Sequence, residues 1–331
     1  MPEYRSFAEQ TLHYLIRDHE GAPTGPVDSP AAWYGPEMAA DPGQWLVELP
    51  DSAVAEIHDA ASELATRGMA LAEVTAASFP LPGLASDIAA WRKILGTGLG
   101  FVCLRGLPVE HWGPDLSALA YWGLGHHLGI PGAQNPADEL LGHVVDYGEE
   151  ADNPMVRRYR TTGTIDFHCD AADVVGLLCL HPARSGGQSR IASSVTIYNE
   201  LQRQHPELVE RLFTPFHLDR RDEQGEGEDP TVSITPCAYA AGQLRTFWHS
   251  EYFRSAARHP EVPDFDTTER QLLDAYDAIA CDPGIYLDMW LQPGDVQFIS
   301  NHTTVHARTG YEDYPEPERR RHLLRLWLSL A

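Results

Sequence analysis

The final segment of the chain, residues 319–330, constrains the fold most because apolar and polar side chains alternate along it. On an extended strand the leucines would share one face: Leu324, Leu326, Leu328 and Leu330. Arg321, Arg325 and Trp327 would share the other face. An arginine is costly to bury without an anionic partner, and its planar guanidinium suits a carboxylate held through two hydrogen bonds. The pattern predicts a strand between a core and a carboxylate-binding pocket, the alternative being a basic edge strand exposed to water.

Apolar patterning predicts the other helices and strands of the chain. Strands are expected at 100–106, 173–180 and 294–300, where short apolar runs are bounded by glycine or polar residues. Helices are expected where apolar residues recur at three- and four-residue intervals: 50–70, 115–127, 194–213 and 267–280. Asp266 and Glu269 resemble a capping box at the start of the last of these helices. Strands therefore dominate after about residue 164, and helices interrupt them.

Two segments are expected to have no helix or strand. Residues 1–50 are rich in proline and glycine, which predicts an arm that wraps the protein with little regular structure and is not a separate domain. Residues 219–230 are polar and end in proline, which predicts a surface loop. That loop is either plainly solvated or able to close over a site.

The charge of the chain argues against two classes of partner. A formal net charge of -24 repels phosphate backbones and anionic membrane surfaces, so no nucleic-acid or membrane partner is expected. The N-terminus is charged, and no run approaches the roughly 20 apolar residues of a membrane helix, so we expect a cytoplasmic protein. The five cysteines show no CxxC spacing, and Cys103 and Cys179 lie in strand-like runs, where they are expected to be buried.

His168 and Asp170 form the first candidate metal-binding pair. They are two residues apart in an extended segment, so both side chains leave the same face while Cys169 points away. An imidazole and a carboxylate are two thirds of the two-histidine, one-carboxylate triad that binds non-haem Fe(II) and leaves positions open for co-substrate and oxygen. Alone, such a pair is also compatible with a surface hydrogen bond.

The second histidine of the triad must come from a distant segment, and two candidates follow the strand that ends at Ser300. His302 and His306 could share a helix face in a zinc-type arrangement, but the β-branched residues between them argue against a helix. On an extended chain the two histidines are about 13 Å apart, so only one of them can reach the metal.

Five stretches together resemble the taurine dioxygenase and 2,4-D dioxygenase (TauD/TfdA) family. They are FHCDAADVVGLLCL (167–180), SGGQS (185–189), QPGDVQFISN (292–301), VHART (305–309) and RHLLRLWL (321–328). The likeness covers roughly residues 95–331, and the order and spacing of the stretches are strongly specific. It implies a fold that is mainly β with flanking helices, the double-stranded β-helix or jelly roll, within a single catalytic domain over residues 1–331.

The resemblance also assigns roles to individual residues. The Val-His-Ala-Arg context implies that His306, with His168 and Asp170, binds the iron. Arg321 is the first of an Arg-x-x-x-Arg pair and corresponds to the arginine that binds 2-oxoglutarate, and Ser189 takes the place of a threonine hydroxyl on the same molecule. The remaining positions lie where relatives contact substrate: Arg325, Gln134, Asn135 and Ala171.

The implied reaction uses Fe(II), 2-oxoglutarate and O₂ to hydroxylate or desaturate an unactivated C–H bond of a small molecule, with release of succinate and CO₂. Specialised metabolism is the expected setting, and homo-oligomerisation is left open. Two other functions remain alternatives at this point. One is a cupin-like zinc hydrolase or isomerase with the same ligands, which the Arg321 strand argues against, and the other is a non-catalytic jelly-roll protein that binds metal or ligand.

Overall fold

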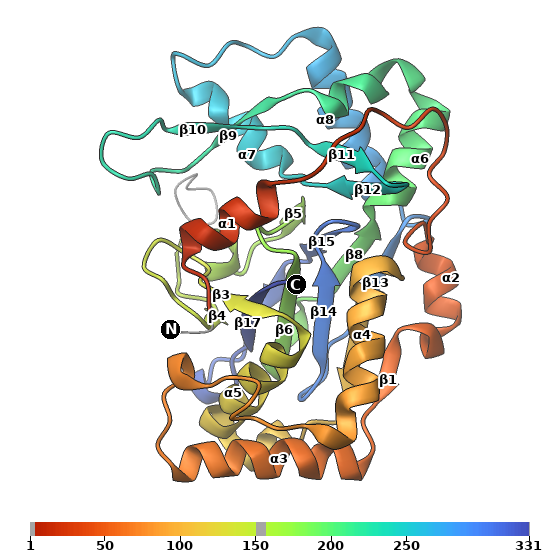
Figure 1. The fold of residues 1–331 in the computed structure, drawn as a ribbon. Coiled ribbons are helices and arrows are strands. Elements are labelled where there is room, and N and C mark those ends of the chain that lie inside the picture. The colour runs from red at the N-terminus through yellow and green to blue at the C-terminus, as the bar shows by residue number, and fades with distance from the viewer. Residues whose placement is uncertain (1–3, 150–156, 331) are drawn as a thin grey trace.

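The computed structural model describes residues 4–149 and 157–330 as mixed sheets and helices around two central sheets (Figure 1). The larger sheet has the order β1-β2-β14-β6-β17-β3, with β4 also paired to β17. Its strands are β1 (Leu46–Glu48), β2 (Phe101–Arg105), β3 (Ile130–Gly132), β4 (Gly142–Val144), β6 (Val174–His181), β14 (Val296–Ser300) and β17 (His322–Ser329). The smaller sheet has the order β13-β8-β15-β5. Its strands are β5 (Ile165–His168), β8 (Ser189–Ser193), β13 (Tyr286–Met289) and β15 (Thr304–Arg308).

Helices and short strand pairs surround the two sheets (Figure 1). The helices are α1 (Phe7–Leu15), α2 (Gly35–Ala40), α3 (Asp51–Thr66), α4 (Ala85–Thr97), α5 (Val109–Leu128), α6 (Ser194–Gln204), α7 (Ser250–Ser255) and α8 (Thr267–Ala280). The short pairs are β7 (Ser185–Gly186) with β16 (Tyr311–Glu312), β9 (Phe216–Asp219) with β10 (Thr231–Ile234), and β11 (Cys237–Ala240) with β12 (Gln243–Thr246).

The alternation along β17 places the larger sheet between two apolar layers. The leucines of one face pack with helices α3, α4 and α5: Leu324, Leu326 and Leu328. On the opposite face, Trp327 packs with Ile191 of β8 and Leu287 of β13, so the two sheets pack face to face. The strand predicted from the sequence is therefore confirmed, and each of its faces meets a different core.

A third apolar layer covers the outer face of the smaller sheet. Ala192 of β8 and Val305 of β15 pack there against Tyr198 of α6 and Tyr276 of α8. The capping box of α8 is confirmed, because Asp266 accepts a hydrogen bond from the Glu269 amide at 2.8 Å. The smaller sheet is thus held from both sides, which fixes the β5 and β15 strands.

Two expectations about secondary structure were wrong. The helix expected over 194–213 ends at Gln204, because Pro206 lacks an amide hydrogen and its ring clashes with the preceding turn, and a 3-10 helix, η5, then spans Pro206–Phe213. The N-terminal arm has more regular structure than expected, since Ser6 and Glu9 form a capping box that begins α1. The arm also supplies β1, which pairs with β2 in parallel.

Within the described ranges, no helix is long and apolar enough to cross a membrane. Cys103 and Cys179 are buried free thiols, as expected.

Candidate metal centre

His168, Asp170 and His306 converge at one end of the smaller sheet. His168 ends β5 and pairs directly with His306 of β15, and the two imidazole rings are 4.2 Å apart between centroids. The His306 Nε2 atom lies 3.8 Å from Asp170 Oδ2. One potential ligand atom from each residue lies within 4.8 Å of the others. Cys169 points into the core instead, as the alternation requires.

The three side chains fit a single metal ion of the non-haem Fe(II) type. Two imidazoles and one carboxylate are the donor set of the facial triad. The His168 Nδ1 atom lies 2.8 Å from the Asp166 carbonyl oxygen, which fixes the ring so that Nε2 faces the metal position. Burial and the neighbouring His168 lower the pKa of His306 to about 3, so its imidazole is neutral and able to bind metal.

Asp170 is held as a carboxylate by several neighbours. Burial opposes its ionisation, but Arg325, His306, His168 and the Trp327 indole outweigh that effect, so the pKa of Asp170 is lowered. The Trp327 Nε1–H donates to Asp170 Oδ2 at 3.1 Å, and the Asp170 amide donates to Asn301 Oδ1 at 3.0 Å. The carboxylate is therefore oriented by β17 and by the loop that follows β14.

His302 lies away from this centre. Its Nε2 atom is 2.7 Å from Asp173 Oδ1, and its ring stacks on Tyr14 of α1 with 4.7 Å between centroids. Asp173 also accepts from the Leu330 amide at 2.7 Å, and the His13 Nε2 atom lies 3.0 Å from it. This network ties α1 and the end of β17 to the segment after Asp170. It engages His302 outside the metal centre, whereas the pairing of β15 with β5 places His306 beside His168.

A cavity extends from the triad to a second group of polar residues. The residues at its far end are Ser189, Arg308 and Arg321. Arg321 is 4% exposed, and its Nη1 atom is buried without a hydrogen-bond partner. Burial lowers the pKa of Arg321, as it does for any cation withdrawn from water. The Ser189 hydroxyl donates to Gln297 Oε1 at 2.8 Å.

Arg325 stands beside the metal centre. Its Nε–H donates to Gln134 Oε1 at 2.7 Å, and the Gln134 side chain donates back to the Arg325 carbonyl oxygen at 2.7 Å. Asn135 bonds to Glu139, and Ala171 packs at the edge of two apolar clusters. The described lining of the cavities at the triad includes Arg325 but not Gln134, Asn135 or Ala171.

A second cavity adjoins the triad from the other side. It shares five residues with the first: Tyr159, Ile165, His168, Asp170 and Arg325. The rest of its wall consists of Arg157, Arg158, Arg221, His249, Glu251 and Tyr252. The metal position therefore lies where the two cavities meet, one ending at Arg321 and the other opening toward α7.

Sequence reasoning missed His249, which precedes α7. The ring centroids of His249 and His168 are 5.1 Å apart, and His249 stacks on Tyr252 at 3.6 Å. Burial, and then the neighbouring His168, lower the pKa of His249 well below its usual range. An isolated β-bridge between His168 and His249 brings the two together, and no motif in the sequence signals that pairing.

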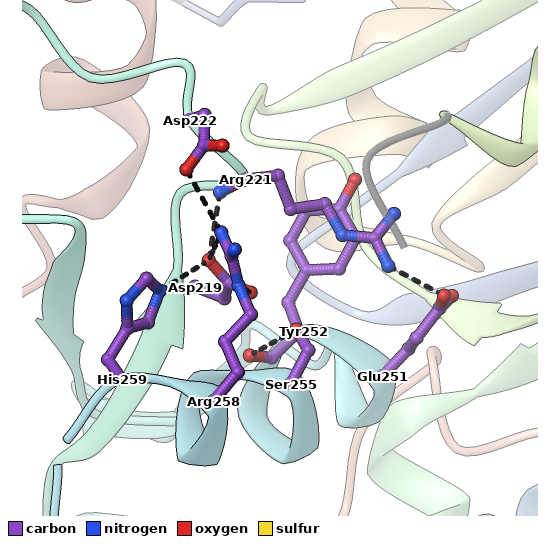
Figure 2. A network of polar contacts seen from close by, with 8 residues as sticks. All are labelled: Asp219, Arg221, Asp222, Glu251, Tyr252, Ser255, Arg258 and His259. Carbon is purple, nitrogen blue, oxygen red and sulfur yellow. Dashed lines mark hydrogen bonds and ion pairs between the residues drawn. The ribbon is translucent and has the colours of Figure 1, made fainter. Parts of the chain in front are cut away.

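The loop of residues 219–230 is tied to the wall of this second cavity (Figure 2). Asp219 is 1% exposed and accepts hydrogen bonds from Arg258 Nε at 2.8 Å and from the Arg221 amide at 2.9 Å. Arg221 has a φ of 52°, a left-handed conformation that is unusual for a residue with a side chain. Its guanidinium pairs with Glu251 at 2.7 Å. The start of the loop is therefore anchored and contributes to the site.

Replacing Asp219 by asparagine is expected to lower the free energy of unfolding at pH 7 by about 2 kcal/mol, because buried charge-assisted hydrogen bonds are lost. Although burial opposes ionisation, Arg258, the Arg221 amide and His259 hold the pKa of Asp219 well below its usual value. A lowered pKa stabilises the fold above the unfolded-state pKa of about 3.9 and does so progressively less below it. Denaturation at several pH values should therefore show the difference shrinking below about pH 4, and a constant difference would contradict this account.

Comparisons with known proteins identify a family and several relatives of this chain. The family described as "Taurine catabolism dioxygenase TauD, TfdA family" matches residues 65–327. The FR-33289 synthase of Streptomyces rubellomurinus is 32% identical over 314 residues, covering 92% of this chain and 91% of that protein. The taurine hydroxylase-like protein SAT17 of Stachybotrys chartarum is 24% identical over 327 residues, covering 96% of this chain and 82% of that protein.

Solved structures of oxygenases share the fold. An asparagine oxygenase bound to Fe(II), 3-hydroxyasparagine and succinate superposes with a TM-score of 0.69 at 19% identity, covering 86% of this chain and 93% of that one. The non-haem iron oxygenase OrfP with Fe and alpha-ketoglutaric acid gives a TM-score of 0.65 at 17% identity, covering 86% and 94%. From the extent of the family match and the identity to the synthase, the chain belongs to the TauD/TfdA family of Fe(II)- and 2-oxoglutarate-dependent dioxygenases.

Proposed function

We propose that this chain hydroxylates a small organic anion, with one Fe(II) bound by His168, Asp170 and His306. In this proposal 2-oxoglutarate extends along the first cavity and the organic substrate occupies the second. The two sheets would form a double-stranded β-helix over residues 95–331, with residues 1–50 as an arm on a single catalytic domain. The FR-33289 synthase named above supports a place in specialised metabolism.

The observation that carries the proposal is the buried Arg321 at the end of a cavity that begins at the triad. Among the described residues, Arg321 has no carboxylate within ion-pair distance, and its Nη1 atom has no hydrogen-bond partner. A buried, unpaired guanidinium is costly, and a bidentate carboxylate would relieve that cost. A ligand that must reach both the metal and Arg321 needs an anionic end, and the distal carboxylate of 2-oxoglutarate provides one.

Each residue has a distinct part in the proposed reaction. Bound Fe(II) and 2-oxoglutarate would supply the activation of O₂ for oxidation of a C–H bond, with release of succinate and CO₂. His168, Asp170 and His306 orient the metal position, and Trp327 and Asn301 orient Asp170. Ile165, Val175 and Leu177 line the cavity at the triad and would help to exclude water, which protects a reactive site from side reactions.

The position and charge of Arg325 support the proposal that the substrate is an anion. The guanidinium faces both cavities, and its hydrogen-bond partner Gln134 is a neutral amide, which fixes the side chain without cancelling its charge. Asp170 Oδ2 lies 3.7 Å away, but that carboxylate is committed to the metal position. We therefore assign to Gln134 the positioning of Arg325 rather than direct contact with substrate.

The test compares organic anions with matched neutral analogues. Small carboxylates, phosphonates and amino acids, each paired with its ester or amide, are incubated with the Fe(II)-loaded enzyme, 2-oxoglutarate and O₂. We expect at least one anion to accelerate succinate formation and its neutral partner to have a much smaller effect. Equal acceleration by an ester or amide would contradict the anionic substrate, and consumption of no 2-oxoglutarate under any condition would contradict the proposed function.

A further inference from the structure

Arg308 is a second buried arginine in the cavity that ends at Arg321. It lies on β15 two residues after His306, so both side chains leave the same face of the strand. Arg308 is 5% exposed, and it lines the cavity together with Ser189 and Arg321. Neither the spacing of the triad nor the Arg-x-x-x-Arg pair assigns a role to this residue.

The hydrogen bonds of Arg308 leave three of its five N–H donors without a partner. Its Nη2 atom donates to the Thr161 carbonyl oxygen at 2.8 Å and to the Gly163 carbonyl oxygen. Its Nε and Nη1 atoms are buried without partners. The backbone of residues 161–163 therefore fixes the side chain from one edge, while the remaining donors have no partner within the protein.

Two buried guanidinium groups thus line the same cavity. In the described part of the chain, no carboxylate pairs with Arg308 or with Arg321, and both guanidiniums border the ring of Tyr311, at 4.8 and 5.1 Å from its centroid. Two like charges in a water-poor cavity repel each other, and each loses its hydration. A bound carboxylate would relieve both costs, because each of its oxygens accepts more than one hydrogen bond.

We propose that Arg308 and Arg321 together bind the distal carboxylate of 2-oxoglutarate. This inference rests on the proposed function, since it names a further residue of the co-substrate site. Ser189 completes the set once its hydroxyl turns from Gln297 toward the carboxylate. The pair of arginines makes this end of the cavity selective for 2-oxo acids with a second carboxylate.

The experiment measures binding rather than turnover. Mn(II)-loaded wild type and Arg308→Gln are titrated without oxygen by calorimetry, first with 2-oxoglutarate and then with 2-oxovalerate, which has a methyl group in place of the distal carboxylate. We expect Arg308→Gln to bind 2-oxoglutarate roughly tenfold more weakly or worse, because a charge-assisted hydrogen bond is lost. Its affinity for 2-oxovalerate should remain that of the wild type.

Two further variants separate a binding role from a structural one. Arg190→Gln removes a half-exposed arginine of β8 that pairs with Asp288, and it should bind both ligands as the wild type does. Arg308→Lys keeps the positive charge but lacks the planar guanidinium with its two parallel donors. It should bind 2-oxoglutarate more tightly than Arg308→Gln but less tightly than the wild type. An equal loss for both ligands, or no loss for either, would overturn the role of Arg308. A wild type that binds both ligands equally would instead overturn the co-substrate site itself.

Discussion

Replacing Asp170 by asparagine is expected to abolish iron retention and substrate-coupled succinate formation. Asparagine keeps the size of the side chain but removes the negative charge that Arg325 and the Trp327 indole stabilise in the wild type. Loss of a residue that only orients a metal ligand already weakens metal binding by about 10- to 100-fold. Loss of the charge of a ligand itself should therefore weaken iron binding by more than roughly a hundredfold. Iron content after gel filtration and succinate formation measure the two effects.

Asp166→Asn is the matched control, because it makes the same substitution two residues before His168 at an exposed side chain. The contact of Asp166 with the His168 ring is through its backbone carbonyl oxygen, which the substitution preserves. This variant should retain iron and activity. Equal iron content in the two variants would show that Asp170 is not a ligand.

Charge reversal at Arg321 is expected to produce the second large effect. Arg321→Glu would place a carboxylate where the distal carboxylate of 2-oxoglutarate is proposed to bind, so attraction becomes repulsion in a buried cavity. We expect the KM for 2-oxoglutarate to rise by roughly a hundredfold or more, while the iron content stays near that of the wild type. Initial rates of succinate formation at several 2-oxoglutarate concentrations measure this change.

The neighbouring Arg320 supplies the control for this reversal. It is exposed on the loop before β17, where it donates only weakly, at 3.4 Å, to the carbonyl oxygens of Tyr314 and Pro315. Arg320→Glu should leave the KM for 2-oxoglutarate unchanged. If Arg325→Gln raised that KM and Arg321→Glu did not, the two arginines would have exchanged the roles proposed for them.

Much of the fold follows from local patterns in the sequence. The period-two alternation of residues 319–330 predicted a strand with its leucines toward a core and its arginines toward a pocket. Leu324 packs in a core, and Arg321 and Arg325 line the cavity at the triad. Trp327, on the same face as the arginines, packs in a second apolar cluster. The spacing of His168 and Asp170 predicted two side chains on one face, which the structure shows. These predictions succeed because they depend on the geometry of a single strand.

Contacts between distant segments could not be predicted in the same way. His249 meets His168 through a single bridge, and Gln134 reaches Arg325 across 191 residues of sequence, so neither contact leaves a periodic pattern. The family resemblance places Gln134 near the substrate, and the structure shows its amide hydrogen-bonded to the backbone and side chain of Arg325. The sequence likewise does not show that Arg308 is buried with unpartnered hydrogen-bond donors, because this depends on the contacts made in the folded protein.

The most direct test of the metal and co-substrate site is the visible absorption of the Fe(II)-loaded protein on addition of 2-oxoglutarate without oxygen. Chelation of the metal by a 2-oxo acid should produce a charge-transfer band. With one iron bound per chain, this band should saturate at about one 2-oxoglutarate per iron. His306→Ala should lose this band, because one of the three ligands is missing. A wild type without the band, or a His306→Ala variant with the full band, would contradict the iron site formed by His168, Asp170 and His306.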